Sequence, residues 1–296
     1  LNSLITHYIF MKLSEQNGAD RRNPGIRAFF SKNKYLLNDD ILFTAELDRL
    51  IINFERVSDT INGQLINQLN GNLRPFVSSY LFFREDSTYL DYILRLGILI
   101  ELSELSYSHK IFKGFLEEIN LMYSQVDSVS TEDLISKIRN HIHTNFLYDD
   151  VKQILTESGI SNSLLYVNEY LFALEQGVRL NLEGNIDIEH IMPQSGLNRE
   201  NIMLDAGFET QEEFREYAEK IGNKILLEAD INRGIGDAWF RTKRENSITS
   251  GHGYIGSKFP IAKFLANYQS DTWTREDIDK VTEKAAKRIA DFVFER

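Results

Sequence analysis

The sequence contains no cysteine among its 296 residues. This absence excludes disulfide frameworks, thiolate nucleophiles and cysteine-ligated zinc, so any metal ion must be held by oxygen and nitrogen ligands. Long apolar runs are also missing. The most apolar run, residues 90–102, is interrupted by three charged residues and is shorter than the ~20 residues of a membrane span. No secretory signal is visible near Leu1. We therefore expect a soluble cytoplasmic chain, without a membrane partner, that is a piece of a longer protein.

An excess of basic residues is missing too. The chain has 33 Lys and Arg against 44 Asp and Glu, a net charge of −11, which is the wrong sign for a protein that wraps nucleic acid nonspecifically. One segment, residues 232–263, differs. It holds two acidic residues and six basic ones, which are Arg233, Arg241, Lys243, Arg244, Lys258 and Lys263. This local excess of four positive charges is the candidate surface for an anionic partner.

The length favours two domains of about 150 residues each, and apolar residues recur at helical spacing through the first 180 residues. Residues 19–34, with a turn at Pro24-Gly25, are expected to form a loop. A helix over residues 1–18 is expected to end at Asn17-Gly18, and a capping box at Ser130 is expected to open another. The remaining predicted helices cover residues 41–57, 61–69, 75–83, 89–105, 111–123 and 162–175.

The periodicity changes to two residues near Asn185, where the stretch Ile186–Gln194 alternates and runs into Pro193. Glu189 and His190 then lie near the exit of a strand. A second strand is predicted over residues 220–227, after an insertion that carries a helix opened by a capping box at Thr210. Helices are predicted over residues 235–245, 258–268 and 274–296. An acid beside a strand-end histidine is more often structural than catalytic, so the pair needs further support.

That support comes from later residues. The motif Ile188-Glu189-His190-Ile191-Met192-Pro193-Gln194 is followed in order by Ile221-Gly222-Asn223, Asn232, Phe240, Lys243 and Tyr254-Ile255-Gly256-Ser257. This arrangement resembles the HNH nuclease ββα-metal finger. It is most similar to the C-terminal HNH domain of GmrSD-type, modification-dependent (type IV) restriction endonucleases. The resemblance implies a mainly α chain with a small α+β part: a helical domain over residues 1–180, then an HNH-type nuclease domain over residues 181–296.

The resemblance also implies roles for single residues. His190 would be the general base, and Asn223 would hydrogen-bond the finger's backbone or orient the His190 ring. Glu189, where family members often carry Asp, would hold a divalent ion with Asn232; Mg²⁺ is expected and Mn²⁺ is an alternative. The residues expected to contact DNA are Lys243, Arg241, Arg233 and Lys258. A solvated helix lysine explains Lys243 equally well.

The implied activity is metal-dependent hydrolysis of phosphodiester bonds in double-stranded DNA, modified or not, in bacterial or archaeal phage defence. The Asp-Gly-Gln-Gln-Arg signature of the family's amino-terminal nucleotide-handling domain does not occur in the chain, nor does a Walker-type loop. No nucleotide site is therefore expected here, and that domain would be a partner. The alternative is a catalytically silent binding or assembly module that keeps the HNH fold. His190, Asn223 and Asn232 together favour the nuclease, whereas the acidic charge favours the silent module.

Overall fold

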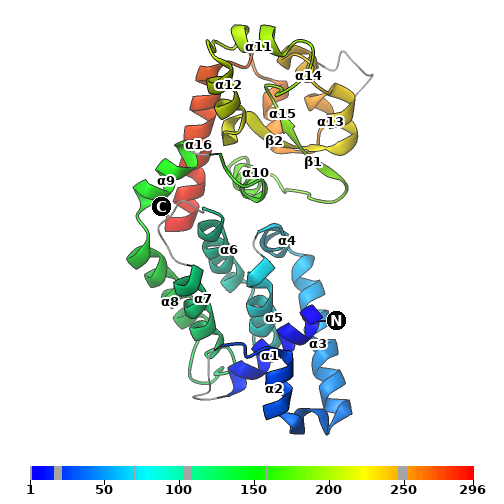
Figure 1. Ribbon diagram of the computed structural model, residues 1–296, viewed down its shortest axis with the longest axis vertical. Helices are drawn as coiled ribbons and strands as arrows, with labels where there is room; N and C mark the ends of the chain where they lie inside the picture. The colour runs from blue at the N-terminus through cyan, green and yellow to red at the C-terminus, as the bar shows by residue number, and fades with distance from the viewer. Residues whose placement is uncertain (1, 17–21, 70, 103–108, 158, 246–252) are drawn as a thin grey trace. The chain divides into compact units, whose positions relative to one another are not determined.

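The computed structural model describes all residues except 1, 17–21, 70, 103–108, 158 and 246–252 (Figure 1). Its elements group into two compact units, which are residues Leu1–Phe146 (unit 1) and Leu147–Arg296 (unit 2). Because a compact unit need not coincide with a functional domain, the domain division at residues 180 and 181 stays a prediction. Within the described part of the chain, no helix is long and apolar enough to cross a membrane.

All the regular secondary structure that is described in unit 1 is helical, as predicted. Helix α1 packs against α5 and α3, and α6 packs against α4 and α8. The predicted capping box at Ser130 is confirmed, because Ser130 and Asp133 each bond the other's backbone N–H at the start of α8. The helices are α1 (Asn2–Glu15), α2 (Ile26–Lys32), α3 (Asp40–Ser58), α4 (Ile61–Gln68), α5 (Arg74–Phe83), α6 (Thr88–Glu101), α7 (His109–Asn120) and α8 (Thr131–Asn145).

Helix α2 corrects the loop predicted over residues 19–34. Gly25 has φ +85°, which glycine adopts without strain, and the helix begins immediately after it. Phe29 is 1% exposed and packs with Ile9 and Leu13 of α1. Burial of that ring explains why a segment rich in turn signals is helical. The helix end predicted at Asn17-Gly18 lies outside the described residues.

Unit 2 contains the single two-stranded sheet of the described residues, in which β1 (Ile186–His190) pairs antiparallel with β2 (Lys224–Glu228). His190 lies opposite Lys224, and Glu189 lies opposite Ile225. Helices α10, α13 and α15 pack against β2, and α16 packs against α9 and α10 (Figure 1). The helices are α9 (Tyr148–Glu157), α10 (Ser163–Glu175), α11 (Arg199–Asp205), α12 (Gln211–Ala218), α13 (Ala229–Ile235), α14 (Phe240–Glu245), α15 (Pro260–Ala266) and α16 (Arg275–Phe294).

Several element boundaries in unit 2 differ from the predicted ones. Residues 221–223 form a 3₁₀ turn, so the second strand begins at Lys224 instead of residue 220. The helix predicted over residues 235–245 is two helices, because Gly236 (φ +51°) ends α13 and donates its N–H to the carbonyl of Asn232. Asn232 therefore lies inside α13. Helices α9 and α11 were not predicted, whereas the capping box at Thr274 is confirmed.

Candidate active site

Asn223 holds the chain immediately after His190. Its side chain is fully buried: Oδ1 accepts the N–H of Met192 at 2.8 Å, and Nδ2 donates to the carbonyls of Met192 (3.1 Å) and Ala218 (3.2 Å). Its own carbonyl accepts the N–H of Ile191 at 2.9 Å. Of the two contacts expected for Asn223, the structure has the one to the backbone. These bonds fix the direction in which the chain leaves β1.

His190 ends β1 with a ring nitrogen available to accept a proton. Its Nε2 is buried, has no hydrogen-bond partner among the described residues, and lies 4.0 Å from Oε1 of Glu219. Burial lowers the pKa of His190, Lys224 and Lys243 lower it further, and Glu219 opposes them. The imidazole is therefore neutral at neutral pH, which is the form that a general base requires.

Glu189 is engaged by two donors inside the protein. Lys243 Nζ lies 2.5 Å from its Oε1, and the hydroxyl of Tyr254 donates to the same oxygen at 2.9 Å. Lys243 also donates to the carbonyl of His190 at 2.7 Å. Burial raises the pKa of Glu189, although Lys243 and Tyr254 favour the charged form. Glu189 thus ties β1 to α14.

The carboxylate that the fold brings to Asn232 is Asp187. Nδ2 of Asn232 lies 3.4 Å from Oδ2 of Asp187, and both side chains are partly buried. Asp187 and Glu189 are two residues apart on a strand, so they share one face of it. Sequence reasoning missed Asp187, although this alternation was a signal that could have identified it. No described contact joins Glu189 to Asn232.

The sequence model of the family "GmrSD restriction endonucleases, C-terminal domain" matches residues 120–288, more than half of the chain. The chain belongs to this family. Its members are modules of restriction endonucleases, whose substrate class is DNA. No curated protein and no solved structure matches the chain significantly.

The donor set of this GmrSD C-terminal domain fits a divalent ion at Asp187 and Asn232 better than at Glu189. The Asp187–Asn232 contact is long for a hydrogen bond, so little is lost when it opens. A carboxylate and an amide oxygen suit Mg²⁺, which binds few protein groups and completes its shell with water and phosphate. At Glu189, by contrast, a bound cation would have to share the oxygen with the ammonium of Lys243. The described residues contain no group of three or more His, Asp or Glu side chains placed to hold a metal.

Lys243 lies inside this GmrSD domain instead of on its surface. Its side chain is completely buried in the ion pair with Glu189, so it has no surface that could reach a DNA phosphate in this conformation. The alternative prediction, a solvated lysine, is wrong, whereas a contact from Lys243 to DNA stays a prediction. A buried carboxylate 54 residues earlier in the chain accounts for the difference.

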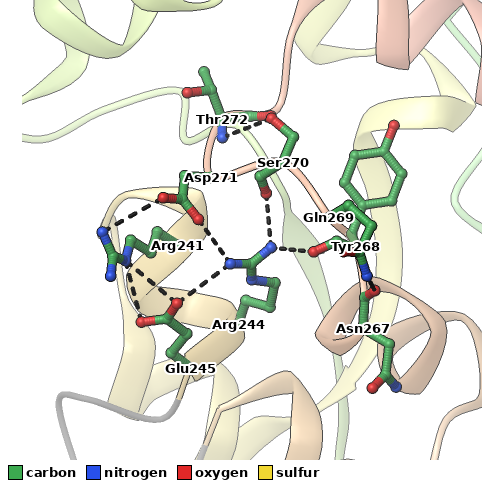
Figure 2. A network of polar contacts seen from close by, with 9 residues as sticks. All are labelled: Arg241, Arg244, Glu245, Asn267, Tyr268, Gln269, Ser270, Asp271 and Thr272. Atoms are coloured by element: carbon green, nitrogen blue, oxygen red, sulfur yellow. Dashed lines mark hydrogen bonds and ion pairs between the residues drawn. The ribbon is translucent and has the colours of Figure 1, made fainter.

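Most other cations of the predicted basic segment are also engaged. Arg244 is bonded to Asp271 and to the carbonyls of Tyr268 and Ser270, and Arg241 pairs with Glu245 and Asp271 (Figure 2). Lys258 donates to the carbonyl of Glu183. Arg233 and Lys263 are exposed and have no bonded partner in the described parts of the chain. Contacts from Arg233, Arg241 and Lys258 to DNA stay predictions.

Proposed function

We propose that this chain is the metal-dependent DNA endonuclease module of a modification-dependent restriction protein, and that it hydrolyses phosphodiester bonds at an HNH-type site. Family membership supports the class of enzyme. The observation that carries the site is the geometry of His190: no group in the described part of the chain hydrogen-bonds its Nε2, while Asn223 holds the backbone beside it. The order strand, strand, helix in β1, β2 and α13 agrees with a ββα finger.

His190 is the general base in this proposal. A water molecule beside Nε2 gives up its proton to the neutral imidazole as its oxygen attacks phosphorus. Glu219, 4.0 Å from Nε2, then favours the imidazolium that forms. Lys243 contributes by holding the His190 carbonyl, so the imidazole starts from a fixed backbone.

Asp187 and Asn232 would hold the divalent ion, Mg²⁺ or Mn²⁺. When bound, the ion neutralises charge on the phosphoryl oxygens and assists the leaving alkoxide. Glu189, the ligand expected from the sequence, would bind the ion only if its ion pair with Lys243 opened. The substrate would be double-stranded DNA, with any preference for modified bases supplied together with the family's amino-terminal nucleotide-handling domain.

The test uses the full chain in a plasmid-nicking assay across Mg²⁺ and Mn²⁺ concentrations, on modified and unmodified DNA. We expect His190→Ala to lower the cleavage rate by roughly 10²–10⁴-fold, the usual contribution of a positioned general base. His109→Ala removes an exposed imidazole from unit 1 and should leave the rate unchanged.

Calorimetry with Mn²⁺ separates the base from the ligands. His190→Ala should bind the ion as the wild type does, whereas Asp187→Ala and Asn232→Ala should bind it weakly and regain part of their activity at high metal concentration. A His190→Ala protein rescued by extra metal would show instead that His190 is a ligand. Tight DNA binding without cleavage under any metal condition would favour the silent binding module.

A further inference from the structure

A cavity in unit 2 is lined by residues other than those proposed for cleavage. It is a cavity of about 350 Å³, within the range of small-molecule sites. Its walls come from α10, the turn before β2, α15 and α16. The residues on which its chemistry depends are Phe172, Lys224, Tyr268, Trp273, Lys280 and Lys284.

The wall of this cavity is aromatic and includes a buried indole N–H. Trp273 is 2% exposed, and its Nε1–H has no acceptor among the described residues. The indole N–H is a donor only, so an acceptor on a ligand that reaches it would restore the hydrogen bond lost on burial. Tyr268 packs edge-on against Trp273, with ring centres 5.2 Å apart, and also lines the cavity. A flat ring that bears hydrogen-bond acceptors fits such a wall.

The mouth of the cavity carries free positive charge. Lys280 and Lys284 are exposed, lie four residues apart on one face of α16, and form no ion pair among the described residues. Three nearby acids are already paired with other cations: Asp279 with Lys220, Glu283 with Lys152, and Glu175 with Arg288. Glu276 and Asp277 lie one turn before Lys280 on the same helix, and Asp277 bonds Thr274 and Tyr268. In a chain of net charge −11, the two exposed lysines are the cations of this lining that an anion can reach from solvent.

The cavity adjoins the end of β1. Ile191, the residue after His190, lines it, and so does Lys224, which is paired with His190 across the sheet. A strand whose phosphate lay at His190 would thus have a neighbouring nucleotide close to the cavity. Aromatic walls with nearby cations are how proteins hold unstacked bases and their phosphates.

We propose that this cavity binds one unpaired nucleotide, with its base against Trp273 and Tyr268 and its phosphate at Lys280 and Lys284. Only the source of the nucleotide, the DNA strand being cut, rests on the proposed function. The sequence led us to expect no nucleotide site in this chain, because it lacks a glycine-rich phosphate loop. The cavity provides lysine side chains on a helix instead.

Fluorescence of Trp273 reports on occupancy directly. The chain has two tryptophans, so Trp239→Phe leaves Trp273 as the only one. Stacking of a base should quench its emission saturably when a deoxynucleoside monophosphate or a short single-stranded oligonucleotide is titrated without metal. Tighter binding of the oligonucleotide would assign the strand as the source, and tighter binding of the monophosphate would assign a free nucleotide. Either result supports the site.

Charge and volume are tested separately. Replacing Lys280 and Lys284 together by Ala should weaken binding at least tenfold, since the phosphate loses both cations. Lys287→Ala is the matched control, because Lys287 lies on the same helix, pairs with Asp291 and is not part of the lining. Val281→Phe should reduce the quench by narrowing the cavity while keeping both lysines.

The test distinguishes an error in the proposed nucleotide site from an error in the proposed nuclease function. The His190→Ala variant, inactive under the proposed function, must still bind the nucleotide. No saturable quench by either probe, or unchanged affinity in the double lysine variant or in Val281→Phe, would overturn the proposal. Circular dichroism of each variant confirms that it is folded.

Discussion

The ammonium of Lys243 joins two elements of unit 2, α14 and β1. It pairs with Glu189 on β1, donates to the carbonyl of His190 and itself belongs to α14. Both partner side chains are at most 5% exposed, so water screens neither charge. Such a pair persists because each charge satisfies the other, and removing only one of them leaves the second buried and uncompensated.

At this scale we predict that Lys243→Ala lowers the free energy of unfolding by about 3–5 kcal/mol, measured by urea denaturation. Lys263→Ala removes an exposed lysine and should change it by less than about 0.5 kcal/mol. Adding Glu189→Gln to Lys243→Ala should restore part of the loss, because the buried charge is gone. A Lys243→Ala protein with unchanged stability but reduced DNA affinity would indicate instead that Lys243 contacts DNA.

At the scale of elements, Arg244 fastens the loop between α15 and α16 to α14. Its guanidinium donates to the carbonyls of Tyr268 and Ser270 and pairs with Asp271 at 2.8 Å (Figure 2). A planar fork with several donors can satisfy these groups together, which a single ammonium cannot do. Because Tyr268 and Trp273 line the proposed nucleotide cavity, this contact also holds part of its wall.

We predict that Arg244→Ala costs about 2–3 kcal/mol of stability, since carbonyls bonded to a cation lose their donor. Hydrogen exchange in residues 267–273 should accelerate along with this loss. Arg241→Ala is the matched control. Its side chain is 61% exposed and pairs with the exposed Asp271 and Glu245, so removal should cost below about 1 kcal/mol. Equal effects of the two substitutions would contradict the role given to Arg244.

At the scale of the whole molecule, stability depends on pH through buried histidine. His7 in unit 1 is 8% exposed, with Nδ1 2.9 Å from the hydroxyl of Ser78. Burial lowers its pKa to about 4, and Arg74 acts in the same direction. Burial also lowers the pKa of His141 to about 4. These two histidines therefore bind protons less readily in the folded protein than in the unfolded chain.

From this we predict that the protein loses stability as the pH falls from 6.5 toward 4. In that window the unfolded chain, with an ordinary histidine pKa, binds protons that folded His7 refuses, so unfolding is favoured. The contribution of His7 is roughly 1–3 kcal/mol. Urea denaturation at pH 7 and pH 5 measures it. His7→Gln should reduce the pH dependence of the free energy of unfolding, and His109→Ala should not. If this free energy changes equally with pH in His7→Gln and in the wild type, the role given to His7 is wrong.

The sequence by itself determined most of the helical segments and the approximate position of the two strands, but it missed α9 and α11. Apolar spacing, the capping boxes at Ser130 and Thr274, and the stop at Pro193 are local signals, because each depends on residues that are close in the chain. It also determined the family through an ordered set of motifs. Local signals failed at α2, where burial of Phe29 outweighed a turn-rich composition.

Tertiary structure alone decided how the candidate site is partnered. Lys243 meets Glu189 across 54 residues, and Asn232 meets Asp187 across 45, so neither pair follows from helical or strand spacing. The same holds for the proposed cavity, whose lysines come from α16 and whose floor includes the start of β2. Periodicity fixes which face of an element is buried. Which charge meets which other charge depends on the packing of elements distant in the chain, and that information is absent from any local pattern.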